Sequence, residues 1–245
     1  MWNKPHVLNA IADLLLIVTV AALFAVAAVW LVRMPKLPIR QVVVAEPLQH
    51  VRRAEVEQAL AGNLRGNFFS VNVEAVRQAL EQLPWVRRAQ VRRLWPARLE
   101  LHIEEHKPVA RWEENRAAGR NELVNSHGEV FAALLAEKEA LALPQMYGPT
   151  GTAPDLLKRF AEFSATLAPV GLKPAQLNLS PRLAWQLRMA DGMVIELGRE
   201  QAKAPVATRL QRFVEIYPGA VGNRPQPPAA VDLRYPNGFA MRGRG

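Results

Sequence analysis

An uninterrupted apolar run near the N-terminus limits what this chain can fold into more than any other feature. Leu14–Val32 contains 19 residues without a charged side chain, and Trp30 and Arg33 stand at its end. A helix of this length, rising about 1.5 Å per residue, nearly matches the roughly 30 Å hydrocarbon core of a bilayer. Aromatic and basic residues are typical of helix ends at a membrane interface. The run predicts one transmembrane helix, 14–33, after a short tail, 1–13.

A cleaved signal peptide is the alternative for the same run. Leu14–Phe24 could serve as its apolar core, and Ala25-Val26-Ala27 could serve as a small-residue cleavage site. The apolar run continues beyond that site to Val32, which favours an anchor over a cleaved peptide. A buried core helix is disfavoured because the run has no polar face.

Charge alone does not decide on which side of the membrane the rest of the chain lies. Lys4 and the amino terminus precede the run, whereas Arg33, Lys36 and Arg40 follow it. This count would leave the C-terminal part in the cytoplasm. Long domains, however, cross the membrane largely regardless of flanking charge, and 245 residues leave a long C-terminal part here. Both orientations stay open at this point.

Composition limits the kinds of partner and of chemical site that this chain can have. The formal net charge of +9 suits contact with anionic lipid, nucleic acid or an acidic partner, but selects none of them. The chain has no cysteine, which excludes disulfides, thiolate metal sites and a cysteine nucleophile.

The region after the anchor predicts the order strand, helix, helix, strand, strand. A short Pro-containing linker, Met34–Pro38, leads to Ile39–Ala45, which is β-branched and apolar and therefore predicted as a strand. Arg52–Ala61 shows apolar residues at helical spacing. Asn72 can cap a second helix, Val73–Gln82.

The next stretch, Trp85–Trp112, predicts a β-hairpin. Apolar and polar side chains alternate on both sides of the turn Trp95-Pro96-Ala97, most clearly where Leu99, Leu101 and Ile103 share one face. A period of two residues is the pattern of a strand that is buried on one side.

Within the second strand of this hairpin, His102-Ile-Glu-Glu-His106 matches the zinc-protease pattern H-x-x-E-H. Zinc would need both imidazoles on one face of a helix. In a strand, residues four apart are separated by roughly 13 Å, too far to share an ion. The alternation favours a strand, so a metalloprotease using His102, Glu105 and His106 is disfavoured, and we expect no metal and no cofactor.

The Arg-Arg pairs of the same hairpin invite a nucleic-acid interpretation, since tryptophan can stack on bases and arginine can bind phosphate. The alternative is a polar sheet face in which the arginines are balanced by Glu100 and Glu104 on the neighbouring strand. The acidic neighbours and the preceding membrane span favour the polar sheet face, so we expect no nucleic-acid partner.

From residue 110 onward, short strands alternate with two amphipathic helices, and the whole chain is predicted to be α+β. Leu141–Gly151 is expected to be a loop. The expected elements are two extended pieces in Leu123–Phe131, a helix from Pro154 to about Ala168, strands at Leu177–Leu179, Ala184–Met189 and Met193–Leu197, a helix at Pro205–Tyr217 and a final strand, Val231–Tyr235, whose continuation is Phe239-Ala240-Met241.

The order and spacing of several short pieces over nearly the whole chain resemble one family. These pieces include Trp85-Val86-Arg87-Arg88-Ala89, Trp95-Pro96, Ala110-Arg111-Trp112, Leu123-Val124-Asn125, Gly128-Glu129-Val130-Phe131, Leu197-Gly198-Arg199, Arg209-Leu210, Arg212-Phe213 and Val231-Asp232-Leu233-Arg234-Tyr235. Together with the N-terminal anchor, they make the chain similar to the FtsQ/DivIB family of bacterial cell-division proteins.

The resemblance implies a single-pass inner-membrane protein with a cytoplasmic tail, 1–13, and a transmembrane helix, 14–33. A POTRA domain (β-α-α-β-β), 39–109, and a mixed β domain, 110–245, would both be periplasmic and lie at the division septum. The implied task is not enzymatic: the protein would recruit and hold divisome proteins, chiefly FtsB and FtsL, linking early and late components. Whether the protein also controls septal wall assembly stays open.

In the family, the partner adds to the edge formed by the last strand of the β domain. The matching residues here are Tyr235, Asn237, Gly238 and Phe239, and Arg182 matches a position near the same face. Such an edge offers unpaired N–H and C=O groups, and aromatic side chains can anchor the partner. The alternative is that Val231–Tyr235 is an ordinary buried closing strand.

A POTRA protein of polypeptide transport or outer-membrane assembly is the second functional hypothesis. It predicts tandem POTRA repeats or long alternating strands of a membrane barrel. The sequence shows neither a second copy nor such alternation, so a division scaffold is favoured.

Overall fold

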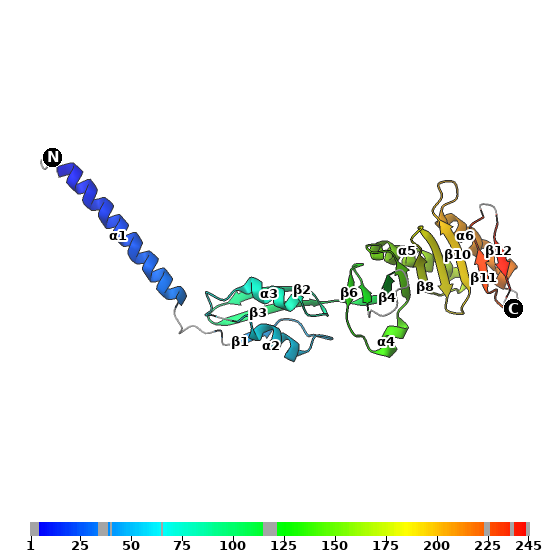
Figure 1. The fold of residues 1–245 in the computed structure, drawn as a ribbon, viewed down its shortest axis with the longest axis horizontal. Helices are drawn as coiled ribbons and strands as arrows, with labels where there is room; N and C mark the ends of the chain where they lie inside the picture. The colour runs from blue at the N-terminus through cyan, green and yellow to red at the C-terminus, as the bar shows by residue number, and fades with distance from the viewer. Residues whose placement is uncertain are drawn as a thin grey trace. The chain divides into compact units, whose positions relative to one another are not determined.

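The chain forms two compact units, Met1–Glu105 and His106–Gly245, which are described separately. The computed structural model describes residues 5–33, 39, 41–64, 66–114, 122–222, 226–235 and 238–243. The linker expected at Met34–Pro38 lies outside these residues. Figure 1 shows the order of the elements along the chain.

The N-terminal element is the helix α1, Pro5–Arg33. Its segment Asn9–Trp30 is long and apolar enough to cross a membrane, and none of it is buried against the rest of the chain. The prediction of one apolar N-terminal helix is therefore confirmed. A helix that is apolar all round and packs against no protein can be satisfied by lipid.

The first unit continues as a three-stranded sheet covered by two helices. Its strands are β1 (Gln41–Val44), β2 (Val86–Leu94) and β3 (Arg98–Glu105), and its helices are α2 (Arg53–Ala61) and α3 (Val73–Glu81). The strand order is β1-β3-β2, with β1 parallel and β2 antiparallel to the central β3. The predicted POTRA order β-α-α-β-β is confirmed, and we call this part the POTRA domain.

The core of the POTRA domain explains the alternation seen in the sequence. Leu99, Leu101 and Ile103 of β3 are buried together with Val76 and Leu80 of α3. Along β3 the intervening residues are partly or fully exposed. The sheet therefore has one apolar face, which the helices cover, and one polar face.

Local signals define where α3 begins. The side-chain oxygen of Asn72 accepts hydrogen bonds from the backbone N–H groups of Glu74 and Ala75, each at 3.1 Å. This N-cap satisfies two donors that lack partners within the helix, as the sequence predicted.

The second unit contains one mixed nine-stranded sheet, with the order β12-β11-β10-β9-β8-β7-β4-β5-β6. Its strands are β4 (Pro108–Glu114), β5 (Glu122–Asn125), β6 (Val130–Ala132), β7 (Gln145–Gly148), β8 (Pro174–Leu179), β9 (Ala184–Met189), β10 (Val194–Arg199), β11 (Ala230–Asp232) and β12 (Ala240–Arg242). The helices are α4 (Glu137–Ala142), α5 (Ala153–Leu167) and α6 (Val206–Tyr217). A short helical turn, η1 (Ala168–Val170), follows α5, and another, η2 (Pro218–Gly222), follows α6.

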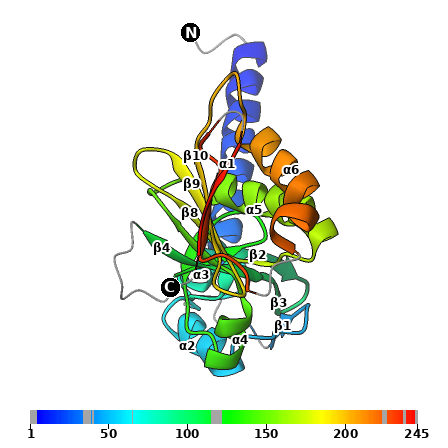
Figure 2. The ribbon, with the colours of Figure 1, turned by 90° about the vertical axis from the view of Figure 1, so that its right-hand side faces the viewer.

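Two of these helices cover one face of the sheet. Figure 2 shows α5 and α6 on the same side of strands β8, β9 and β10, and both helices contribute to one apolar cluster with the sheet. Phe163 of α5 and Phe213 of α6 are buried in this cluster. The apolar stripes predicted for these helices are thus core packing.

Two predictions for the second unit were wrong in part. Leu141–Gly151 was expected to be a loop, but it holds the end of α4 and the strand β7, which lies between β4 and β8 in the sheet. The predicted final strand, Val231–Tyr235, ends at Asp232, and β12 lies beside it. In both cases pairing with neighbouring strands, rather than local sequence pattern, defines the strand.

Candidate partner-binding edge

Strand β12 is the outermost strand at one side of the nine-stranded sheet, among the strands that the structure describes. It pairs antiparallel with β11 through Ala230↔Arg242, Val231↔Met241 and Asp232↔Ala240. The other side of β11 pairs with β10 in parallel. The sheet edge is therefore formed by β12, the continuation of the predicted final strand, because the chain reverses after β11 and covers it.

Three of the predicted site residues meet beside this edge. Tyr235, Gly238 and Phe239 line one hollow of about 270 Å³ together with side chains of α6. Tyr235 is 55% exposed, whereas Phe239 is half-buried and packs against the core of the unit. The fourth residue of this segment, Asn237, lies outside the described residues.

The floor of the hollow is aromatic. The centroid of the Phe213 ring lies 5.6 Å from that of Phe239 and 5.5 Å from that of Tyr217. Edge-to-face contacts of this kind contribute roughly 0.5–1.5 kcal/mol beyond the buried area. The ring of Phe239 is therefore held in place by Phe213, whereas the ring of Tyr235 is exposed.

A buried arginine, to which the sequence assigned no structural role, holds the strands behind this hollow. Arg209 of α6 is 3% exposed. Its Nη1 donates to the carbonyls of Leu197 (2.5 Å) and Leu233 (3.1 Å), and its Nη2 donates to the carbonyl of Arg199 (2.7 Å). Burial lowers the pKa of Arg209. One guanidinium thus satisfies carbonyls at the ends of both β10 and β11.

An ion pair orders the chain just before Tyr235. The guanidinium of Arg234 donates to both oxygens of Asp232, from Nη2 at 2.6 Å and from Nε at 2.9 and 3.0 Å. The hydrogen bonds from Arg234 lower the pKa of Asp232. Gly198 makes room for this arrangement: its φ is +71°, and a Cβ there would lie 2.8 Å from Arg234 Cγ.

Arg182 belongs to a different hollow. It lies in the turn between β8 and β9 and lines a space of about 690 Å³ beside α5, together with Leu183 and Arg199. Leu183 is 60% exposed and has a φ of +58°, a left-handed conformation that is uncommon for a non-glycine residue. The register places this turn at the same end of the sheet as Tyr235, because Ala184 pairs with Arg199 on β10. The structure thus puts Arg182 near the same sheet end, but not in the Tyr235 hollow.

The H-x-x-E-H residues do not form one site. Residues 98–105 form the strand β3, as the alternation predicted. Nδ1 of His102 lies 2.9 Å from Glu46 Oε1, and this carboxylate, followed by that of Glu100, raises the pKa of His102. The carboxylate of Glu105 instead accepts the backbone N–H groups of Gln49, His50 and Val51 at 2.7–2.9 Å.

The polar face of the POTRA sheet is balanced, as predicted. Arg88 and Arg92 of β2 lie opposite Glu104 and Glu100 of β3, respectively. Nη1 of Arg87 also contacts Glu104 Oε1 at 2.9 Å. Cross-strand pairs of opposite charge stabilise a polar sheet face of this kind.

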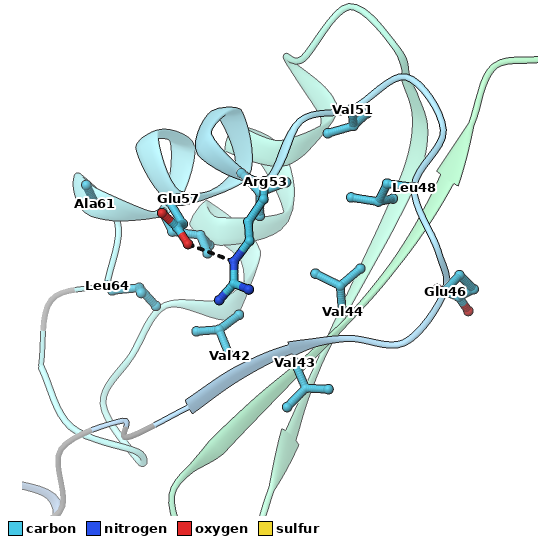
Figure 3. A pocket seen from close by; sticks show the side chains of 12 residues that line it. Val42, Val43, Val44, Glu46, Leu48, Val51, Arg53, Glu57, Ala61 and Leu64 are labelled. Atoms are coloured by element: carbon cyan, nitrogen blue, oxygen red, sulfur yellow. Dashed lines mark hydrogen bonds and ion pairs between the residues drawn. The ribbon is translucent and has the colours of Figure 1, made fainter.

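A separate apolar hollow of about 750 Å³ lies between β1 and α2 (Figure 3). Val42, Val44 and Leu48 point into it, and the ion pair of Arg53 with Glu57, at 2.9 Å, stands beside them.

Two family models together match most of the chain. A POTRA domain of the FtsQ type matches residues 37–106, and the C-terminal domain of cell division protein FtsQ/DivIB matches residues 110–234. Both domains are of the types that the resemblance implied.

Full-length cell division proteins from several bacteria match as well. The cell division protein FtsQ of Burkholderia pseudomallei is 37% identical over 245 residues, which cover 100% of this chain and 95% of that protein. FtsQ of Bordetella pertussis is 34% identical, covering 98% of this chain and 92% of that protein. FtsQ of Coxiella burnetii is 37% identical, covering 93% and 91%, respectively. With its apolar N-terminal helix, its POTRA domain and its mixed β domain, the chain belongs to the FtsQ/DivIB family of cell division proteins.

Proposed function

We propose that this protein is a membrane-anchored, non-enzymatic scaffold of the division machinery, which binds its partners through β12 and the Tyr235 hollow. The partners implied by the family resemblance are FtsB and FtsL. A strand of one partner would pair with the open edge of β12, and its side chains would contact Tyr235 and Phe239.

The combination of an open strand edge with a nearby aromatic hollow is the observation that carries this proposal. Backbone groups on an edge strand give affinity to any extended segment, whereas neighbouring pockets give specificity. Here the hollow of about 270 Å³ adjoins the edge and contains one exposed ring, Tyr235, and one fixed ring, Phe239. Tyrosine is one of the residue types enriched among the few positions that dominate the binding energy of protein interfaces.

The rigidity of the hollow's surroundings also supports binding without large rearrangement. Arg209 joins α6 to the ends of β10 and β11, and Phe213 fixes Phe239 against the same helix. A surface that is already ordered loses less conformational entropy when a partner binds.

The topology that goes with this function places 1–13 in the cytoplasm and 14–33 in the inner membrane. The POTRA domain, 39–109, and the β domain, 110–245, would lie in the periplasm at the septum. We further propose that the scaffold links early and late division proteins and takes part in the control of septal wall assembly.

The experiment is co-purification of the full-length protein with FtsB and FtsL from the same organism. Tyr235→Ala is expected to reduce the bound partners by at least about tenfold, which corresponds to roughly 1.4 kcal/mol. The matched control is Leu134→Ala, which removes an exposed apolar side chain that follows β6, at the opposite edge of the same sheet. Full retention of FtsB and FtsL by Tyr235→Ala, with the control also unaffected, would rule out the Tyr235 hollow as the binding site.

A further inference from the structure

The tip of the β2–β3 hairpin exposes apolar side chains that the proposed partner site does not use. Trp95 is 82% exposed and Leu94 is 40% exposed. Phe69, in the loop before α3, is 42% exposed. It lies at the same end of the domain, because Nη2 of Arg93 donates to the carbonyl of Val71 at 2.8 Å. We call Phe69, Leu94 and Trp95 the hairpin-tip surface. Several large exposed apolar side chains at one end of a domain are a feature of contact sites.

Arginines surround this surface. Arg92, Arg93 and Arg98 all lie within three residues of Trp95 in the sequence, and all three are exposed. Arg92 faces Glu100 across the hairpin, whereas Arg98 faces uncharged Gln41 on β1. Indole rings settle at the level of lipid headgroups, and guanidinium groups beside them can reach lipid phosphates. The tip therefore has the composition of a segment that touches an anionic bilayer.

The topology puts the tip at the end of the POTRA domain to which the membrane anchor is tethered. Strand β1 is parallel to β3, and its first residue, Gln41, pairs with Arg98, the first residue of β3. Only residues 34–40 separate the end of α1 from Gln41, and such a segment spans at most about 29 Å when fully extended. Glu105, the last residue of β3, pairs with Val86 at the opposite end of the sheet.

We propose that the hairpin-tip surface binds the surface of the membrane in which α1 is anchored. Trp95 and Leu94 enter the headgroup region of an anionic phospholipid bilayer, and the flanking arginines contact lipid phosphates. The tether favours lipid over any other occupant, because it keeps this end of the domain within reach of the bilayer. This inference depends on α1 as a membrane anchor, but not on partner binding at β12.

The natural chain has no cysteine, so one introduced cysteine gives a unique labelling position. Full-length protein carrying Leu94→Cys is labelled with a fluorophore and placed in vesicles of phosphatidylethanolamine and phosphatidylglycerol that contain a headgroup-nitroxide lipid. The matched control is Gln82→Cys, an exposed position after α3 at the opposite end of the domain. Quenching by the nitroxide is expected to be about three-fold stronger at position 94 than at position 82.

A second variant separates lipid contact from simple nearness to the bilayer. Adding Trp95→Ser and Arg98→Glu to the Leu94→Cys protein is expected to reduce quenching to the level at position 82, with circular dichroism confirming the fold. Equal quenching at both labelled positions, or quenching unchanged by the two substitutions, overturns the proposal. Protection of the position-94 label from aqueous iodide without nitroxide quenching also overturns it, because a second copy or a partner protein then covers the tip.

Discussion

The rings of Phe239 and Phe213 meet edge to face, with 5.6 Å between their centroids and an interplanar angle of 88°. Phe213 is buried in α6, so this contact fastens the segment that leads into β12 to the helix behind the sheet. Tyr235 is 55% exposed and has no such ring contact with any residue that the structure describes. The two aromatic residues proposed for partner binding therefore play different parts in the free protein.

Phe239→Ala is expected to weaken both folding and partner binding, whereas Tyr235→Ala should weaken partner binding alone. Removing a half-buried phenyl ring and its aromatic contact costs about 1–3 kcal/mol of unfolding free energy. Truncating an exposed ring changes the unfolding free energy by no more than about 0.5 kcal/mol. Urea unfolding followed by circular dichroism measures the first effect, and co-purification measures the second. Identical unfolding midpoints for the two variants would contradict this division of roles.

Arg209→Met is expected to destabilise the β domain by at least about 2 kcal/mol. The change leaves the carbonyls of Leu197, Arg199 and Leu233 without their side-chain donor, and buried carbonyls without a partner are costly. Lys158→Met, on the exposed side of α5, is the matched control and should change stability by less than about 0.5 kcal/mol. Thermal unfolding of the full-length protein in detergent distinguishes them, and similar melting temperatures would show that Arg209 is not a structural link.

A comparison of two glycines separates the effect of backbone strain on stability from the effect of steric crowding. Gly198 and Gly171 have nearly the same φ, +71° and +73°, but only at Gly198 would a Cβ meet another residue, Arg234 Cγ at 2.8 Å. Both Gly→Ala variants should lose about 1 kcal/mol through the left-handed conformation. Gly198→Ala should lose more and also bind partners less well, because it displaces the residue beside Tyr235. Equal losses of stability and unchanged binding in both variants would argue against a steric role of Gly198 beside Arg234.

The His102–Glu46 contact predicts a pH dependence of stability. The pKa of His102 is raised above its ordinary 6.5, chiefly by Glu46 and then by Glu100, while the same contact lowers the pKa of Glu46 below 4.5. A raised histidine pKa stabilises the fold below pH 6.5, and this contribution is lost as the pH rises through the folded-state value. The lowered pKa of Glu46 stabilises the fold above pH 4.5, and this contribution is lost on acidification.

The difference in melting temperature between the natural protein and His102→Gln should therefore be larger at about pH 6 than at about pH 8.5. Gln90→Ala, which changes the residue opposite His102 on β2, serves as the control and should show no such trend. A difference that is constant over this range would mean that His102 does not titrate against these carboxylates in the folded protein.

The sequence predicted those parts of the fold that depend on local pattern. Strand β3 was found because its one buried face makes Leu99, Leu101 and Ile103 alternate with polar residues. Strand β7 was missed because a short strand inside a sheet need not alternate: Gln145 and Met146 are both buried, and prolines flank the segment. The buried role of Arg209 was also missed, since only the assembled ends of β10 and β11 show which carbonyls need a donor.

For the candidate site, the resemblance named individual residues but not their geometry. Tyr235, Gly238 and Phe239 gather in one hollow, whereas Arg182 lines another, because a side chain's neighbours depend on which strands lie between them in the sheet. The expected edge, Val231–Tyr235 and its continuation, is formed by the continuation alone, because β12 pairs with β11 and covers it. Pairing across a chain reversal cannot be derived from alternation alone.

Strand β12 has three residues and, within the described part of the chain, one neighbouring strand. An edge strand of three residues pairs weakly and opens more often than the inner strands. Its amide protons should therefore exchange with solvent faster than those of the inner strands. A partner strand added on its outer side would slow that exchange without touching the interior. Docking of the proposed partner and the last step of folding would then be a single event, and the sheet would be fully formed only in the complex.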